Sequence, residues 1–525
     1  MSSFRGRTIQ VVNDFSIDEQ LYLYEQTRRL KRAMRANSSE VQSFRVQDPE
    51  LGVYLIFLED STRTRESFRN AAKFHRAKVN EFGLAGSSFA KSESITDTVK
   101  MLAGYSRDSV FVMRTPHEGT CRWLEDAVGG YCESHGMRRP AFINAGDGRH
   151  EHPTQEFLDE YSFLERLNWD RSHIHLALVG DLLHGRTVHS KVNGLRLFHE
   201  VEIDLVAPRD ISMPAHYTRQ MEYHGYKLRW FESIEEYLGQ HHVAPLWYFT
   251  RLQLERMGEK LRDRAAALRA AVTFRREFLP RVSQQTRFFH PLPRHRETPV
   301  IPPFLDGLAV NAWDEQAVNG YYTRIIEIAL LAGCLGDDFT GTVQTPPEFS
   351  DDFVEETGPG TRAKGEYKVG IKPVSNGIVI DHIATGQQPE AIWNQVNKIR
   401  KTLGLNCVSS HGVFASEQTG RYKGIISLPG ITQFDERLIK MLGAIAPGCT
   451  LNLITEQQVR RKYRLRMPPR VYNLEEICCR NPDCISHPQH AEPVIAEFYR
   501  SSEEDFVCRY CETPHTFHEI WAQSG

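Results

Sequence analysis

Short apolar segments alternate with amphipathic, helix-like stretches over about residues 50–310. The apolar segments are residues 53–58, 109–113, 173–179, 202–206 and 243–249. This alternation is typical of parallel sheets that helices cover on both faces. Residues 153–167 have the spacing of a helix that connects two such α/β units, and residues 313–335 have that of a closing helix. We therefore predict two doubly wound parallel-sheet domains, at residues 1–152 and 153–336.

The size and composition of the chain indicate a soluble protein with several domains. It has 525 residues, of which 40% are hydrophobic and 25% charged, and this length suits roughly three or four domains. No apolar stretch reaches the roughly 20 residues that cross a bilayer, and the first residues have no signal-peptide pattern. We expect a cytoplasmic protein without a membrane partner. The formal net charge of -3 is small, so no basic field predicts nucleic-acid binding.

The texture of the sequence changes after Gly336. Residues 337–366 are rich in Pro, Gly, Thr and acidic residues without a sustained period, which predicts a linker. Residues 367–470 alternate short β-like and helical runs, which predicts a small α+β domain. Residues 471–525 form the last predicted domain.

Half of the ten cysteines lie in the last fifty residues. Cys479 and Cys484 form one close pair, and Cys508 and Cys511 form a second. Two close pairs of thiolates suit tetrahedral Zn²⁺. Because the set leaves no open coordination position, we predict a structural zinc site in a C-terminal zinc domain.

Cationic side chains recur where predicted strands end. The first is in the segment Ser61-Thr62-Arg63-Thr64, which follows an apolar run and begins a helix. A helix start with unpaired N–H groups and an arginine is suited to binding an anion, although alone it also fits an ordinary helix cap with a surface ion pair.

Further cationic and polar side chains also lie at predicted strand ends or loops. Pro153 suits the first position of a helix, which places His152 just before the helix. Ligands of parallel sheets bind at the carboxyl ends of strands. Together these groups predict a site for a ligand set with two or three negative charges; besides Arg63 they are Lys91, Arg114, His152, Gln155, Arg186 and Arg251. Only one glycine is in position before the helix at Arg186, and GxGxxG is absent, so a nicotinamide cofactor is not expected.

Several motifs occur in the order seen in aspartate carbamoyltransferase. They are STRTR at 61–65, the loop at 87–93, MRT at 113–115, HPTQ at 152–155, GRTVHS at 185–190, TRLQ at 250–253 and HPLPR at 290–294. The resemblance covers about residues 45–335. It implies a carbamoyl-phosphate domain and an aspartate domain, and the transfer of a carbamoyl group from carbamoyl phosphate to L-aspartate in pyrimidine synthesis. The related ornithine enzymes carry HCLP and SMG motifs, which this sequence lacks.

The resemblance also implies roles for the residues. Ser61, Thr62, Arg63, Thr64 and Arg114 would hold the phosphate, and Thr64, Arg114 and His152 would polarise the carbamoyl carbonyl. Gln155 would bind the carbamoyl amide, while Arg186, Arg251 and Gln253 would bind aspartate. Backbone groups at Leu292 and Pro293 would orient the reacting nitrogens. Ser87 and Lys91 resemble residues that a neighbouring subunit contributes at a trimer interface, so we expect a homo-oligomer. Ala90 stands where some members have a second lysine.

Residues 370–525 resemble the regulatory chain of the same enzyme through GIVIDHI at 377–383 and CRNPDCISH at 479–487. Asp381, His382 and Lys462 would then lie at a site for CTP or ATP. The family's second nucleotide lysine is expected near Ile426 and Ser427, where none occurs. Two interpretations stay open: nucleotide regulation, or a domain that serves assembly alone.

The run of basic residues at 460–466 allows one interpretation of a different class. Beside a predicted zinc site, it would suit a nucleic-acid-binding protein with an inactive enzyme-like front. The complete set of substrate residues and the small net charge favour the enzyme.

Overall fold

The computed structural model describes residues 3–83, 93–253, 264–350, 352–358, 374–405, 410–415, 420–433 and 435–521. The chain divides into two compact units. The first comprises residues 1–345 with 479–494 and 510–512, and the second comprises the remaining residues. None of the helices within the described ranges is both long and apolar enough to cross a membrane.

The first sheet of the first unit is parallel throughout. Its strand order is β1-β5-β4-β2-β3, and the strands are β1 (Thr8–Ile9), β2 (Leu51–Phe57), β3 (Lys78–Gly83), β4 (Asp108–Thr115) and β5 (Ala141–Asp147). Strand β5 continues through Asn144 and Gly146 to Asp147, although these residue types are more typical of turns. Asn144 is compatible with the strand because its side chain is buried and donates to the backbone oxygen of Gln10 at 2.9 Å.

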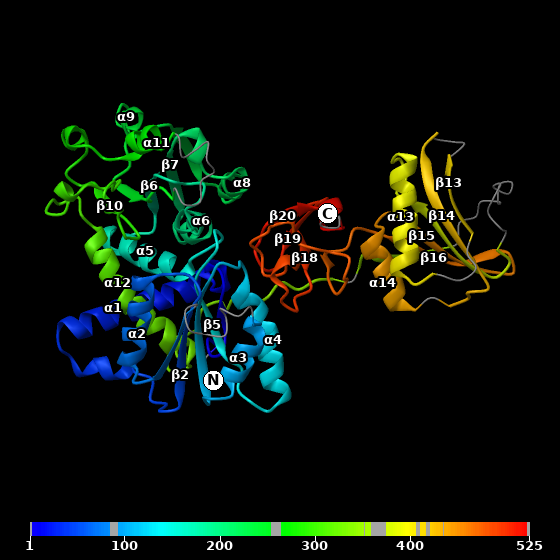
Figure 1. Ribbon diagram of the computed structural model, residues 1–525, viewed down its shortest axis with the longest axis horizontal. Helices are drawn as coiled ribbons and strands as arrows, with labels where there is room; N and C mark the ends of the chain where they lie inside the picture. The colour runs from blue at the N-terminus through cyan, green and yellow to red at the C-terminus, as the bar shows by residue number, and fades with distance from the viewer. Residues whose placement is uncertain are drawn as a thin grey trace. The chain divides into compact units, whose positions relative to one another are not determined.

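Helices cover both faces of this sheet (Figure 1). Alternate strand side chains belong to two different cores: Val53 and Val110 face one of them, and Tyr54 and Phe111 face the other. The covering helices are α1 (Ile17–Arg35), α2 (Thr62–Phe74) and α12 (Trp313–Leu331) on one face, and α3 (Ile95–Ala103) and α4 (Thr120–Ser134) on the other. The predicted doubly wound architecture is confirmed.

The second sheet is also parallel throughout. Its order is β10-β9-β6-β7-β8, with β6 (His173–Val179), β7 (Glu200–Val206), β8 (Lys227–Phe231), β9 (Leu246–Phe249) and β10 (Arg287–Phe289). The associated helices are α6 (Arg186–His189), α7 (Lys191–Gly194), α8 (Ala215–Tyr223), α9 (Ile234–Tyr237) and α11 (Ala265–Val272). Between the two sheets, α5 (Pro153–Arg166) packs against α12.

The second unit contains a six-stranded antiparallel sheet of order β11-β16-β15-β12-β14-β13. Its strands are β11 (Val354–Thr357), β12 (Gly377–Ile383), β13 (Ser410–Ala415), β14 (Tyr422–Pro429), β15 (Thr450–Thr455) and β16 (Gln458–Leu465), with helices α13 (Pro389–Thr402) and α14 (Glu436–Ile445). The small α+β domain predicted from the sequence is present. Part of the segment predicted as a linker is the edge strand β11.

The basic run at 460–466 coincides largely with β16, and acidic residues of β11 oppose it. Arg461 pairs with Glu356 at 2.7 Å, and Arg466 pairs with Glu355 at 2.6 Å. These ion pairs account for part of the run within the sheet and leave less positive charge for a nucleic acid.

A short antiparallel sheet of order β17-β18-β19-β20 follows. Its strands are β17 (Arg470–Val471), β18 (Phe498–Arg500), β19 (Asp505–Cys508) and β20 (Pro514–Thr516), and α15 (Phe517–Trp521) comes after them.

Candidate active site and metal centre

A cavity of about 780 Å³ in the first unit brings together most of the predicted substrate residues. It lies where strands of both parallel sheets end, as expected for α/β folds. The predicted residues that line it are Ser61, Thr62, Arg63, Thr64, Arg114, His152, Gln155, Arg186, Arg251, Gln253, Leu292 and Pro293. Four arginines that are far apart in the sequence therefore face one space.

The N-terminus of α2 forms one wall of the cavity. Ser61 is the N-cap residue and makes no side-chain capping bond, so the cap leaves its hydroxyl available. The first turn of α2 contains no acidic residue, so the helix dipole favours an anion there.

Two arginines that line the cavity, Arg114 and Arg186, are held by one carboxylate. Glu59 Oε2 lies 3.3 Å from Arg186 Nη1 and 3.7 Å from Arg114 Nη2. Arg186 also donates to the Gly148 carbonyl at 2.9 Å, and Arg114 donates to the Ala145 carbonyl at 3.1 Å. Glu59 comes from the first parallel-sheet domain and Arg186 from the second, so the pair connects the two domains.

His152 is a buried neutral imidazole in the cavity wall. Burial and the charges of Arg114, Arg186 and Arg324 hold its pKa well below the usual value. Its backbone N–H donates to Ser190 Oγ at 3.1 Å. At neutral pH the ring can therefore donate or accept a hydrogen bond without carrying charge.

Four further predicted residues, Arg251, Gln253, Leu292 and Pro293, follow β9 and β10. Arg251 and Gln253 come after β9, where the Gln253 N–H donates to Asp181 Oδ2 at 3.1 Å and its side chain donates to the His184 carbonyl at 2.7 Å. Leu292 has a φ of +52° and precedes Pro293 through a cis peptide bond. The Leu292 N–H donates to His290 Nδ1 at 2.7 Å, which fixes this turn.

Arg324 and His290 are among the residues that line the cavity without having been predicted from the sequence. Arg324 comes from the middle of α12, where it is 4% exposed, and burial lowers its pKa to about 10. A single arginine within an apolar helical run was the available signal. His290, also buried, has a pKa of about 3 because of burial and the neighbouring Arg294, Arg63 and Arg251. Predicted Ser87 and Lys91 lie outside the described residues.

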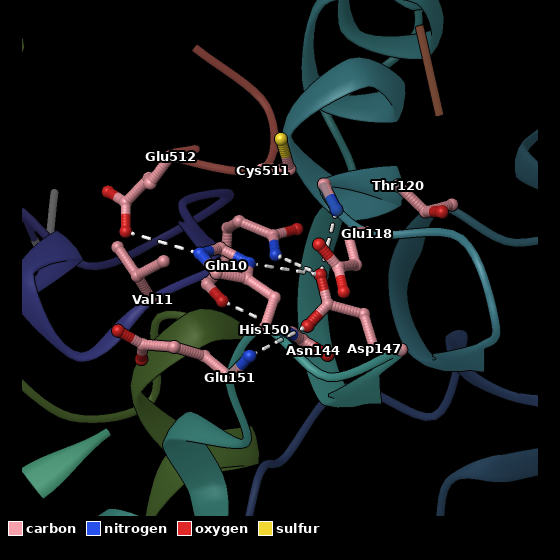
Figure 2. Close-up of polar contacts among 12 residues, drawn as sticks. Gln10, Val11, Glu118, Thr120, Asn144, Asp147, His150, Glu151, Cys511 and Glu512 are labelled. Carbon is pink, nitrogen blue, oxygen red and sulfur yellow. Dashed lines mark hydrogen bonds and ion pairs between the residues drawn. The ribbon is translucent and has the colours of Figure 1, made fainter. Parts of the chain in front are cut away.

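A polar network surrounds the buried His150, two residues before His152 (Figure 2). The His150 ring lies 3.4 Å from Asp147 Oδ2 and 3.2 Å from Glu512 Oε2. Asp147 also accepts from Gln10 Nε2 at 2.7 Å and from the Gly119 N–H at 2.8 Å. Burial opposes the charge on His150, but Asp147 and Glu512 raise its pKa well above the usual value. The network connects the loop of His152 with the residue after Cys511.

The four predicted cysteine ligands converge. The sulfur atoms of Cys479, Cys484, Cys508 and Cys511 all lie within 4.8 Å of one another, and all four residues are buried. The Cys479 and Cys511 sulfurs are 3.6 Å apart. A tetrahedral ion with bonds of about 2.3 Å places its thiolates about 3.8 Å apart, so the geometry fits a four-thiolate metal site.

Next to Cys484, the first parallel-sheet domain contributes Glu118. Its backbone N–H donates to the Asp483 carbonyl at 2.7 Å, and its carboxylate accepts from Asn481 Nδ2 at 2.6 Å. The loop between the first two cysteines is thus fastened to the first parallel-sheet domain.

The predicted effector residues lie on the six-stranded sheet. Asp381, near the end of β12, forms an ion pair with Lys423 of β14 at 2.8 Å. The His382 ring bonds Thr450 Oγ1 at 3.2 Å. Val379, Asn452 and Lys462 are in register across three strands, so Asp381 and Lys462 share one face of the sheet. Lys423, the partner of Asp381, lies three residues before Ile426.

Four family profiles match the chain. Aspartate/ornithine carbamoyltransferase profiles match at residues 7–165 (carbamoyl-P binding domain) and 172–332 (Asp/Orn binding domain). The allosteric domain of the aspartate carbamoyltransferase regulatory chain matches at 369–466, and its metal binding domain at 469–521. Fold and site together define a carbamoyltransferase.

Relatives specify the family. Protein PyrBI of Thermotoga maritima is 50% identical and that of Treponema denticola 47%, each covering 99% of both chains. The aspartate carbamoyltransferase catalytic subunit of Methanosarcina barkeri is 31% identical over 63% of this chain and 99% of its own length. The aspartate transcarbamoylase structure from Trypanosoma cruzi with N-(phosphonacetyl)-L-aspartic acid matches at 27% identity with a TM-score of 0.53, covering 62% of this chain and 96% of that one.

The chain belongs to the aspartate carbamoyltransferase family and carries catalytic and regulatory parts in one polypeptide. The predicted family, fold class and enzyme activity are confirmed.

Proposed function

We propose that the cavity binds carbamoyl phosphate between the start of α2 and Arg114, and L-aspartate between Arg186, Arg251 and Gln253. The convergence of Arg63, Arg114, Arg186 and Arg251 on one space supports this assignment most strongly. Guanidinium groups bind phosphate and carboxylate as bidentate forks. T. cruzi aspartate transcarbamoylase has been solved with carbamoyl phosphate and aspartate.

Thr64, Arg114 and neutral His152 then polarise the carbamoyl carbonyl while the amine attacks, and Gln155 holds the carbamoyl nitrogen. Backbone groups at Leu292 and Pro293 orient the reacting nitrogens. Since no strong base is assigned, the leaving phosphate takes the proton. Catalysis then comes from positioning and from stabilisation of charge.

An assay for carbamoyl-aspartate with ornithine as a competing acceptor tests the substrates. We expect product from aspartate alone, and product from ornithine alone would contradict the assignment. Arg63→Ala should abolish turnover and leave the fold intact, because Arg63 is at the cavity and outside the core. Full activity of this variant would overturn the phosphate site.

We infer that active sites are shared between copies of the chain in a trimer-based homo-oligomer, through Ser87 and Lys91 of a neighbour. Mixing inactive Lys91→Ala and Arg63→Ala chains tests this inference. Hybrids should recover part of the activity, because some sites would receive neither substitution. Hybrids as inactive as the two parents would exclude shared sites.

We infer that the bound metal is Zn²⁺, in a structural role. Four buried thiolates at tetrahedral spacing support this identity. Metal analysis of the purified protein should give one zinc per chain, and another ion at that stoichiometry would correct the inference. A cytoplasmic location stays a prediction.

We propose that Asp381, His382, Lys423 and Lys462 bind a nucleotide effector such as CTP or ATP. Lys423 supplies the cation missing at 426–427, and the shared sheet face supports the grouping. CTP should shift the aspartate saturation curve of the wild type and not that of Lys423→Met. If no nucleotide shifts the aspartate saturation curve, the proposed effector site is wrong and the domain serves only assembly.

A further inference from the structure

Lys191 is a fully buried lysine behind the cavity. It begins α7, its side chain is 0% exposed, and it is absent from the residues that line the cavity. Its ammonium lies 2.6 Å from Glu156 Oε2 and 2.9 Å from Asp159 Oδ2. It also lies 4.0 Å from the centroid of the Tyr248 ring, which adds a cation–π contact. A charge in such a place is costly unless it is paired.

The carboxylate of Asp159 connects this lysine to the cavity. Its Oδ2 accepts from Lys191, while its Oδ1 accepts from Gln155 Nε2 at 2.8 Å and from Gln316 Nε2 at 2.6 Å. Gln155 and Gln316 both line the cavity. An ionised carboxylate only accepts hydrogen bonds, so each amide must turn its nitrogen towards Asp159.

The orientation of Gln155 follows from this arrangement. With Nε2 held by Asp159, the amide oxygen of Gln155 is the group left for the cavity. A protonated Asp159 could donate instead, and the amide could then turn round and present its nitrogen. The orientation therefore depends on Asp159 staying ionised.

Lys191 is the ammonium that pairs with Asp159 in a crowded acidic region. Glu156, Asp159 and Glu160 all lie on α5 and are all 0% exposed. Burial raises the pKa of Glu156 to about 7. Burial and the neighbouring Glu156 raise the pKa of Glu160 well above its usual value. Burial opposes the charge on Lys191, but Asp159 and Glu156 raise its pKa. One ammonium thus serves mainly Asp159 and Glu156.

We propose that Lys191 is a positioning residue of the carbamoyl-phosphate site, which acts through Asp159 to hold the amide oxygen of Gln155 towards the carbamoyl nitrogen. The carbamoyl NH₂ group needs an acceptor, and Gln155 in this orientation provides it. This inference rests on the proposed role of Gln155.

A double-mutant cycle with Lys191→Met and Gln155→Ala tests the proposal. Each single variant should raise KM for carbamoyl phosphate by about tenfold, the effect of one lost hydrogen bond. KM for aspartate should change by less than about twofold. The double variant should resemble Gln155→Ala alone, because coupled residues are not additive.

The outcomes separate the two claims. An unchanged KM for carbamoyl phosphate in Gln155→Ala would contradict the role of Gln155 in the proposed function. Gln155→Ala could raise KM for carbamoyl phosphate as expected while the double variant shows the product of the two single increases. That result would overturn the role of Lys191 and leave the proposed function standing.

Lys31→Met is the matched structural control. Lys31 is also buried, with a side chain 4% exposed, and it bonds Glu165 and Asn319, each at 2.7 Å, away from the cavity. It should lower stability without moving either KM.

Should Lys191→Met fail to fold, the paired variant Asp159→Asn with Lys191→Met removes both charges, which costs less than removing one. The amide that replaces the carboxylate at position 159 can present either its oxygen or its nitrogen to Gln155, so KM for carbamoyl phosphate should still rise. A wild-type KM in this variant would overturn the proposal.

Discussion

Two ion networks involve residues before and after the segment 152–155 in the sequence, and they differ in the cation that holds them. The network after the segment is held by Lys191, whose pKa its carboxylate partners raise, so that it stays charged at neutral pH. The network before it is held by His150, between Asp147 and Glu512. The first holds the side-chain amide of Gln155, whereas the second can respond to pH and joins the catalytic part to the metal-binding segment through Glu512.

The largest expected effect is on the lysine network. Lys191→Met leaves buried carboxylates without a counter-ion, and we expect it to cost about 3–5 kcal/mol of unfolding free energy. Thermal or denaturant unfolding measures this cost. The paired variant with Asp159→Asn should recover most of it, and no recovery would mean that Lys191 contributes by packing.

Removal of the metal should have the second-largest effect. It should act near the histidine network and not near the lysine network, because Glu512, the partner of His150, follows Cys511. A chelator that strips the cysteine site should expose the four thiols to a thiol reagent, because the ion that would bind all four sulfur atoms is then gone. Buried Cys121, which belongs to no metal cluster among the described residues, serves as the internal control. Thiols that stay unreactive after the metal has left would show that the segment folds without it.

The smallest effect is the pH response of His150. Its pKa is raised in the folded protein, so its stabilising contribution is complete below the ordinary value of about 6.5 and is lost as pH rises through the folded value. We expect Tm to decline with pH above about 6.5, and His150→Gln to flatten this decline. An identical pH profile in the variant would assign the decline to other groups, among them Glu151, whose pKa burial raises to about 8.

Much of the cavity could be predicted from the sequence because its residues follow apolar strands. Arg114, Arg186 and Arg251 each stand near a strand end, and the carboxyl ends of parallel strands share one edge. Cys479 and its partners were predicted because metal ligands have characteristic spacing.

Other features have no local signal. Arg324 and Lys191 are in helices, and their importance comes from residues far along the chain that tertiary packing places beside them. Strand β16 was interpreted as a basic run because its charged residues hide the apolar alternation, and only the pairing with β11 shows why the charges are compatible with a sheet.

The edge strand β11 has a consequence for separating the two halves of this polypeptide. Val354–Thr357 pairs along β16, the Phe353 carbonyl accepts from the Arg466 N–H at 2.7 Å, and the Phe353 ring lies against Gly443 of α14. A protease cut or gene division after residue 358 would remove β11 from the regulatory fragment. The edge of β16 would then be unpaired and able to pair with strands of other molecules. A fragment that begins before residue 352 keeps β11 as its edge strand and is the better choice for expression.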